Sequence, residues 1–190
     1  MINSHLQRLL VTLPLLAAVT LLAGCQSMPQ EEQAVKADLI GSSHTAIDVV
    51  MENIEASALK KEFNKEEPIL VTSFVNIDNV QLSSTLGRII GEQVGARLSQ
   101  RGYKVIEVKM RNDSIVVRQQ NGEMALSRVL ADISNSHNAQ AVAVGTYAEA
   151  DENIYITLKM IRASDNVILY SHNYSIPKDD DIRKMLKAKR

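Results

Sequence analysis

Three apolar segments follow one another in the last third of the chain, and they constrain the fold more than any other feature. They are QAVAVGTYA at 140–148, NIYITLKMI at 153–161 and NVILYSHNYSI at 166–176. The first is apolar on both faces, as a central strand would be. The second alternates with period two; its apolar positions are Ile154, Ile156, Leu158 and Met160. Because the turn Ser164-Asp165-Asn166 is short, the pattern predicts an antiparallel meander.

The chain before this meander alternates between helical and strand periods. Residues 43–65 carry a helical stripe, formed by Ile47, Val50, Met51, Ile54 and Ala58. A second helix is predicted from a cap at Ser83 or Ser84 to Arg101, with Gly102 closing it, and a third from about Glu123 to His137. Strands are predicted at 69–77 and 103–110, with an extra short strand at 115–118. The acidic start and basic end of 179–190 predict a short final helix.

This order of elements defines a fold class. A helix between the first two strands implies a right-handed parallel crossover. We therefore predict an α/β (α+β) domain. Its mixed sheet of about five strands has a parallel β-α-β start and an antiparallel C-terminal meander, and helices pack against it.

Cys25 is the only cysteine among the 190 residues, and it directly follows a short apolar segment. That segment, at 9–22, has no charge, and Arg8 precedes it. It is shorter than the roughly 20 residues that a membrane-spanning helix needs, and Pro14 interrupts it. A basic start, an apolar stretch and small residues at the end are typical of a secretory signal. A cysteine that is lost with the cleaved signal is the plain alternative to a modified one.

Leu22-Ala23-Gly24-Cys25 resembles the lipobox of bacterial lipoproteins. The resemblance implies diacylglyceryl transfer to the thiol of Cys25, cleavage before it and acylation of its amine. Several acyl chains on one residue hold a protein essentially permanently in a membrane. Gln26 rather than Asp at the next position implies sorting to the outer membrane.

These boundaries divide the chain into three parts. Residues 1–24 are the predicted signal peptide, 25–37 a lipidated tether and 38–190 a single domain of ordinary size. About eleven polar tether residues have an end-to-end distance of roughly 17–20 Å, and at most about 40 Å when stretched. The domain is therefore expected close to the membrane. Without a second cysteine it has no internal disulfide, so its stability must come from a core.

Gly87, Gly91 and Gly95 repeat at every fourth residue of the second predicted helix. Charged residues lie between them, so the segment is an amphipathic helix rather than a transmembrane one. The stripe is interpreted as a bare backbone surface that lets this helix pack closely. A contact between subunits is the alternative.

No pattern in the sequence indicates catalysis, a cofactor or a metal. His44, His137 and His172 lie on different elements without ligand spacing, and the common catalytic and phosphate-binding motifs are absent. With 21 basic and 22 acidic residues, the chain also lacks the strongly basic balance typical of nucleic-acid binders. The basic C-terminal cluster is interpreted as a solvated helix end, with anionic lipid headgroups or an acidic partner as alternatives. It comprises Arg183, Lys184, Lys187, Lys189 and Arg190.

GEMALSRVL at 122–130 and the segment 141–177 resemble the FlgO family of flagellar outer-membrane lipoproteins. The resemblance extends over roughly 38–186. It implies a structural role at the base of a polar flagellum, in the outer H-ring region, beside the lipoprotein FlgP and the periplasmic protein FlgT. It also implies a homo-oligomer in a ring. The family has no catalytic motif to transfer, so Cys25 is the one functional position carried over.

Two other functions remain as hypotheses from the sequence. A lipid-anchored regulator of an envelope enzyme, such as a cell-wall synthase activator, would share the α/β pattern. It would have to cross the periplasm, which usually requires a long linker rather than eleven residues. An envelope hydrolase would require a catalytic site that the sequence does not show.

Overall fold

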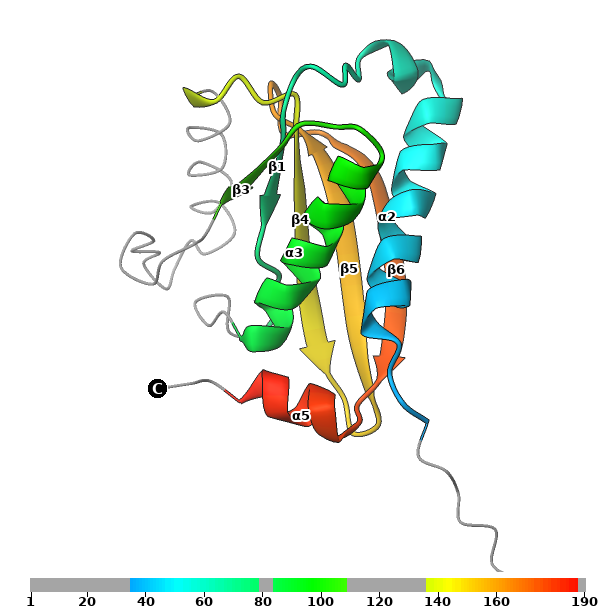
Figure 1. Cartoon of the computed structure of the whole chain (residues 1–190), viewed down its shortest axis with the longest axis vertical. Coiled ribbons are helices and arrows are strands. Elements are labelled where there is room, and N and C mark those ends of the chain that lie inside the picture. Colours follow the sequence, from blue (N-terminus) through cyan, green and yellow to red (C-terminus); the bar gives the residue numbers. More distant parts are fainter. Residues whose placement is uncertain (1–34, 79–83, 109–135, 188–190) are drawn as a thin grey trace, which may run out of the picture. The chain divides into compact units, whose positions relative to one another are not determined.

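The computed structural model describes residues 35–78, 84–108 and 136–187 (Figure 1). The predicted signal peptide, Cys25 and nearly all of the predicted tether lie outside these ranges. So do the short strand predicted at 115–118 and most of the helix predicted from Glu123.

The described strands form one mixed sheet in the order β3-β1-β4-β5-β6, and β2 pairs with β4. They are β1 (Ile69–Thr72), β2 (Val75–Asn76), β3 (Val105–Val108), β4 (Ala141–Glu149), β5 (Asn153–Arg162) and β6 (Ile168–Pro177). β1 is parallel to both β3 and β4. β4, β5 and β6 are antiparallel neighbours. The parallel start and the antiparallel C-terminal meander are thus confirmed.

Two long helices lie side by side on one face of this sheet (Figure 1). They are α2 (Leu39–Ala56) and α3 (Thr85–Gln100). The apolar face of β5 points toward them, and Ile154, Ile156, Leu158 and Met160 are almost completely buried, as predicted. The short helix α5 (Asp180–Leu186) closes the end of the molecule where β4 and β6 finish. The predicted α/β class is therefore confirmed.

The first predicted helix starts earlier and ends earlier than its periodicity suggested. Asp38 caps α2 by accepting a hydrogen bond from the N–H of Gly41. At the other end the hydroxyl of Ser57 accepts from the N–H of Leu59, which gives the backbone a partner outside the α-helix. A 3₁₀ turn (Ala58–Lys61) follows. Ala58 is consequently exposed, so its assignment to the buried stripe was wrong.

The strand predicted at 69–77 is interrupted, and this makes the described strands six rather than about five. Val71 pairs with Ala143, but Val75 pairs with Thr146, so β1–β2 contains one extra residue relative to β4. Such a bulge bends a strand. Here it turns the N–H of Phe74 toward α3, where it donates to the carbonyl oxygen of Gly87 at 2.9 Å.

The ends of α3 agree with the sequence prediction. Ser84 caps its start, because its hydroxyl accepts a hydrogen bond from the N–H of Gly87 at 3.0 Å. Gly102 follows its last turn with a φ of 87°, in the left-handed region that glycine adopts without strain.

Candidate functional site

The folded domain begins beside its own C-terminal helix. The N–H of Ala37 donates to Oδ2 of Asp179 at 2.9 Å, while Oδ1 of the same carboxylate accepts from the N–H of Ile182. These hydrogen bonds, first from Ile182 and then from Ala37, hold the pKa of Asp179 below its usual range. Asp179 therefore fixes the start of the folded domain at the end of the molecule that carries α5 (Figure 1).

Two of the three glycines in the stripe on α3 lie against the backbone of the interrupted strand. A Cβ on Gly87 would overlap the carbonyl oxygen of Phe74, and one on Gly91 would lie 2.6 Å from the carbonyl oxygen of Thr72. At Gly95 the nearest atom would be a side-chain carbon of Val105, at an ordinary 3.5 Å. The close approach of α3 to the sheet thus requires glycine at Gly87 and Gly91.

A buried pair of hydroxyl groups holds the start of α3 on β4. Tyr147 donates from its hydroxyl to Oγ of Ser84 at 2.7 Å, and Ser84 is the N-cap of the helix. Burial raises the pKa of Tyr147, so this hydroxyl is a donor throughout the physiological range. The cap, the glycine contacts and the bulge in β1–β2 therefore form one connected packing unit.

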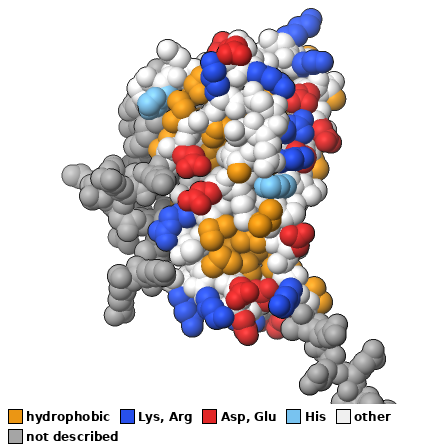
Figure 2. Space-filling view, in the orientation of Figure 1, with side chains coloured by type: hydrophobic (Ala, Val, Ile, Leu, Met, Phe, Trp, Pro, Cys, Tyr) orange, Lys and Arg blue, Asp and Glu red, His pale blue; other side chains and the backbone are white. Residues whose placement is uncertain are grey.

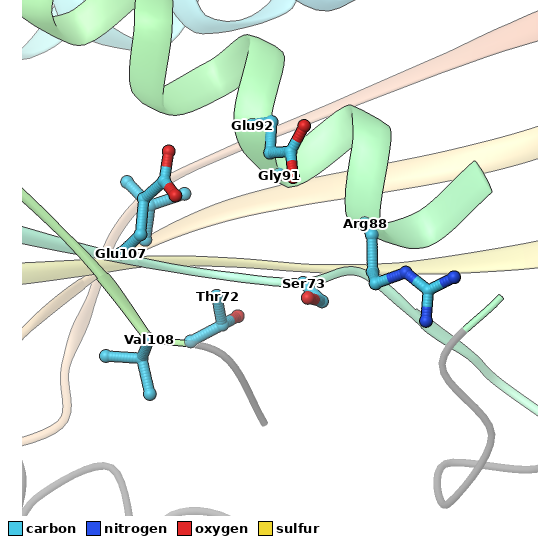
Figure 3. A pocket seen from close by; sticks show the side chains of 8 residues that line it. Thr72, Ser73, Arg88, Gly91, Glu92, Glu107 and Val108 are labelled. Carbon is cyan, nitrogen blue, oxygen red and sulfur yellow. The ribbon is translucent and has the colours of Figure 1, made fainter. Parts of the chain in front are cut away.

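A cavity of about 290 Å³ lies between α3 and the carboxyl ends of β1 and β3 (Figure 3). Glu92 reaches it from α3 and Glu107 from β3. Arg88 extends away from Glu107 and donates to the hydroxyl of Thr85 at 3.1 Å. The remaining lining comprises Val71, Thr72, Ser73, Gly91 and Val108. This open cavity is lined by both acidic and basic side chains, and their arrangement does not indicate a particular reaction.

An ionic cluster joins α2 to α3. Asp48 on α2 pairs with Arg97 at 2.8 Å and with Arg101 at 3.0 Å. Arg101 also pairs with Glu55 at 2.8 Å, and Glu55 accepts a hydrogen bond from the hydroxyl of Tyr103. Burial, then this hydrogen bond, raises the pKa of Tyr103 to about 12. The cluster fixes the two helices relative to each other.

The sequence analysis did not identify this cluster. A weak signal was present, because Asp48 and Glu55 are seven residues apart on one helix and Arg97 and Arg101 are four apart on the other. Each spacing places a charge pair on one side of its helix. Only the tertiary structure shows that the two sides face each other.

The three histidines singled out in the sequence remain apart. His44 lies on α2, His137 in the turn before β4 and His172 on β6. Within residues 35–78, 84–108 and 136–187, no group of three or more His, Cys, Asp and Glu side chains is arranged to hold a metal ion.

The described part of the C-terminal basic cluster lies on α5 and just after it. Arg183 and Lys187 line a second hollow of about 350 Å³, together with Lys178 and Glu149. Lys178 and Glu149 form an ion pair at 3.4 Å. Lys184 pairs with Asp181 at 3.4 Å. Lys189 and Arg190 lie outside the described residues.

The face that carries α2 and α3 has acidic and basic side chains intermixed, with apolar side chains gathered between the two helices near α5 (Figure 2). Ile40, at 59% exposure, is the most exposed large apolar residue of α2. None of the helices in the described ranges is long and apolar enough to cross a membrane.

These features define a small mixed α+β domain in which the clustered ion pairs connect its own helices. A family model described as FlgO protein matches residues 44–181, well over half of the chain, and the chain belongs to the FlgO family. Together with the resemblance of residues 22–25 to a lipobox, this membership supports a lipoprotein associated with the outer membrane. A comparison with curated protein sequences gave no match.

Several solved structures are similar in backbone. The LpoB C-terminal domain from Salmonella enterica has a TM-score of 0.47 at 12% identity, over 73% of this chain and 97% of that chain. LpoB from E. coli gives 0.48 at 10% identity, over 80% and 74%. A PelC dodecamer from Paraburkholderia phytofirmans gives 0.43 at 14% identity, over 60% and 74%. With TM-scores below 0.5, these similarities define neither family nor function.

Proposed function

We propose that this protein is a non-enzymatic outer-membrane lipoprotein with a structural role at the base of the flagellum, in the outer H-ring region. The observation that carries the proposal is the FlgO match over residues 44–181, which extends across nearly all of the folded domain. Cys25 supplies the anchor, and flagellar stability and motility depend on the protein.

The use of charged groups supports a structural role. Asp48 and Glu55 pair with arginines in and directly after α3. The carboxylate of Asp179 accepts hydrogen bonds from the N–H groups of Ala37 and Ile182. An acid–base catalyst needs a carboxylate or imidazole that is positioned beside a substrate and kept available for proton transfer. These carboxylates instead join helix to helix and tether to α5.

The partners in this proposal follow from the family. FlgP and FlgT, named by the resemblance to FlgO lipoproteins, are the neighbours expected at the flagellar base. Many copies held in one membrane plane would reach a high effective concentration, so weak lateral contacts would suffice to close a ring.

Deletion of the gene tests this function. We expect smaller swimming zones in soft agar and fewer retained flagella, with unchanged growth and unchanged sensitivity to a cell-wall antibiotic. Complementation with the wild-type gene is the control. Normal swimming together with antibiotic hypersensitivity would refute the flagellar role and favour a regulator of cell-wall synthesis.

A further inference from the structure

Strand β6 forms one edge of the sheet and has no strand on its outer side among the described residues. It is ten residues long, with the sequence ILYSHNYSIP, and contains no Lys, Arg, Asp or Glu. Natural proteins usually protect such edges with charged side chains, bulges or short strands, because unpaired backbone groups recruit other strands. Here a bulge lies near the start of β6 and Pro177 at its end, so the stretch between them is unprotected.

The register shows which backbone groups of β6 are free. Lys178 lies opposite Glu152 and donates its N–H to the carbonyl oxygen of that residue at 2.8 Å, so this is a hydrogen-bonded pair. Bonded and non-bonded pairs alternate along an antiparallel ladder. The residues whose N–H and C=O groups point away from β5 are therefore Ser171, Asn173 and Ser175, and all three are exposed.

Among the described strands, β3 forms the opposite edge of the sheet, and it offers complementary groups. Ile69 donates its N–H to the carbonyl oxygen of Lys104 at 2.9 Å. In a parallel pair a residue bonds to both neighbours of its partner, here Val105. Lys104 and Ile106 thus face β1, whereas Val105 and Glu107 direct their backbone groups outward.

The two edge strands run in the same direction. β3 is parallel to β1, and β1 is parallel to β4. β5 is antiparallel to β4, and β6 is antiparallel to β5, so β6 runs parallel to β3. Two copies in the same orientation can therefore place β6 of one beside β3 of the next as a parallel pair.

The proposed anchor favours this common orientation. The tether enters the domain beside Asp179, at the end where β6 finishes, and about a dozen residues separate this point from Cys25. A short lipidated tether at this point favours copies that turn the α5 end toward the membrane and their strand edges sideways. An antiparallel pair of two β6 strands would require one copy to stand upside down.

We infer that the outer edge of β6, at Ser171, Asn173 and Ser175, pairs with the edge of β3 in a second copy of this chain. The inference rests on the proposed function for the anchor and for the shared membrane plane. The contact is heterologous, since two different surfaces meet, and it repeats from copy to copy as a ring requires. Main-chain hydrogen bonds supply the contact, as in other cases of strand addition.

Cysteine cross-linking in membranes tests the pairing with full-length, lipidated protein. His172 and Glu107 lie on the helix-bearing face of β6 and β3, respectively. The variant H172C/E107C treated with a short bis-maleimide is expected to give a ladder of dimers, trimers and larger species. Each single variant is expected to give no ladder. Absence of the ladder, or efficient dimers from H172C alone, would overturn the inference.

Proline at the outward position provides the matched test. Asn173→Pro removes an N–H that points away from β5, and proline is tolerated at such edge positions. In the H172C/E107C background, Asn173→Pro is expected to abolish the ladder while leaving the thermal unfolding midpoint unchanged. Asn173→Ala is expected to retain the ladder and the same midpoint. If Asn173→Pro impairs folding, Asn173→Lys replaces it, because an edge charge opposes pairing without removing the N–H.

The outcomes separate this contact from the proposed function. A persistent ladder in the edge variants would refute the β6–β3 pairing even if deletion of the gene abolishes swimming. Normal swimming of the deletion strain would refute the flagellar role, whatever the cross-linking shows.

Discussion

Gly87 shows how a single residue determines the distance between a helix and the sheet. Its missing side chain lets the carbonyl oxygen of Phe74 approach α3, and its own carbonyl accepts the N–H of Phe74. A residue with a Cβ cannot occupy this position unless the backbone moves. Gly95, on the same stripe, has no such neighbour.

The two positions should therefore respond in opposite directions to alanine. Gly87→Ala is expected to lower the free energy of unfolding by about 1–3 kcal/mol, because overpacking forces the backbone apart. Gly95→Ala is expected to raise it by up to about 1 kcal/mol, because a helical glycine is replaced without a clash. Urea unfolding of protein produced without residues 1–25 measures both. Equal effects of the two substitutions would contradict the packing seen around Gly87.

Single residues also mark the limit of prediction from the sequence. The alternation of Ile154, Ile156, Leu158 and Met160 was sufficient to assign a buried strand face, because period two is a local property. The break at Phe74 was not predictable, because it depends on Gly87 and Gly145. The ring of Phe74 occupies the place that a side chain on Gly145 would take, about seventy residues later in the sequence.

At the scale of elements, the helices α2 and α3 are connected by charges as well as by their apolar faces. Hydrogen bonds from Arg97, then those from Arg101, hold the pKa of Asp48 below its usual range despite its partial burial. Because the pKa of the folded state is the lower one, this carboxylate stabilises the fold above its unfolded pKa. The contribution is lost as the pH falls through the folded value.

Asp48→Asn should therefore remove part of the acid sensitivity of the fold. We expect the variant to be less stable than the parent at neutral pH, with a smaller loss of stability between about pH 5 and pH 2. Glu52→Gln, on the exposed side of the same helix, is the matched control and should leave the pH profile unchanged. Thermal unfolding across this pH range gives the comparison, and parallel profiles for Asp48→Asn and the parent would rule out the cluster as the cause.

Most elements were predictable, and their ends were less so. The meander, the parallel crossover and both ends of α3 followed from local patterns, because strand alternation and capping are encoded by nearby residues. The early end of α2 was missed, since the competing hydrogen bonds of Ser57 are invisible in an apolar periodicity. The ionic cluster between α2 and α3 was missed because it forms only when the charged sides of the two helices face each other.

At the scale of the whole molecule, the start of the folded domain lies at a defined point beside α5. Asp179 holds the start of the folded chain beside α5, and Cys25 lies a short stretch of sequence before it. Lipidation of Cys25, as proposed above, would attach the domain to the membrane from the side that carries α5.

Removal of the anchor should be visible as a change in processing. Cys25→Ala is expected to yield uncleaved, mislocalised protein that incorporates no label from an alkyne analogue of palmitate, because the thioether forms only on the cysteine sulfur. Wild-type protein from the same cells is the control. Equal labelling of variant and parent would exclude Cys25 as the lipidation site.

The central claim, a structural lipoprotein at the flagellar base, is tested most directly by locating the protein. Immunogold labelling of full-length protein on isolated flagellar basal bodies with attached outer membrane is the measurement. We predict gold particles concentrated around the basal body at the outer membrane, and loss of this concentration in Cys25→Ala. An even distribution over the outer membrane, with no enrichment at the basal body, would contradict it.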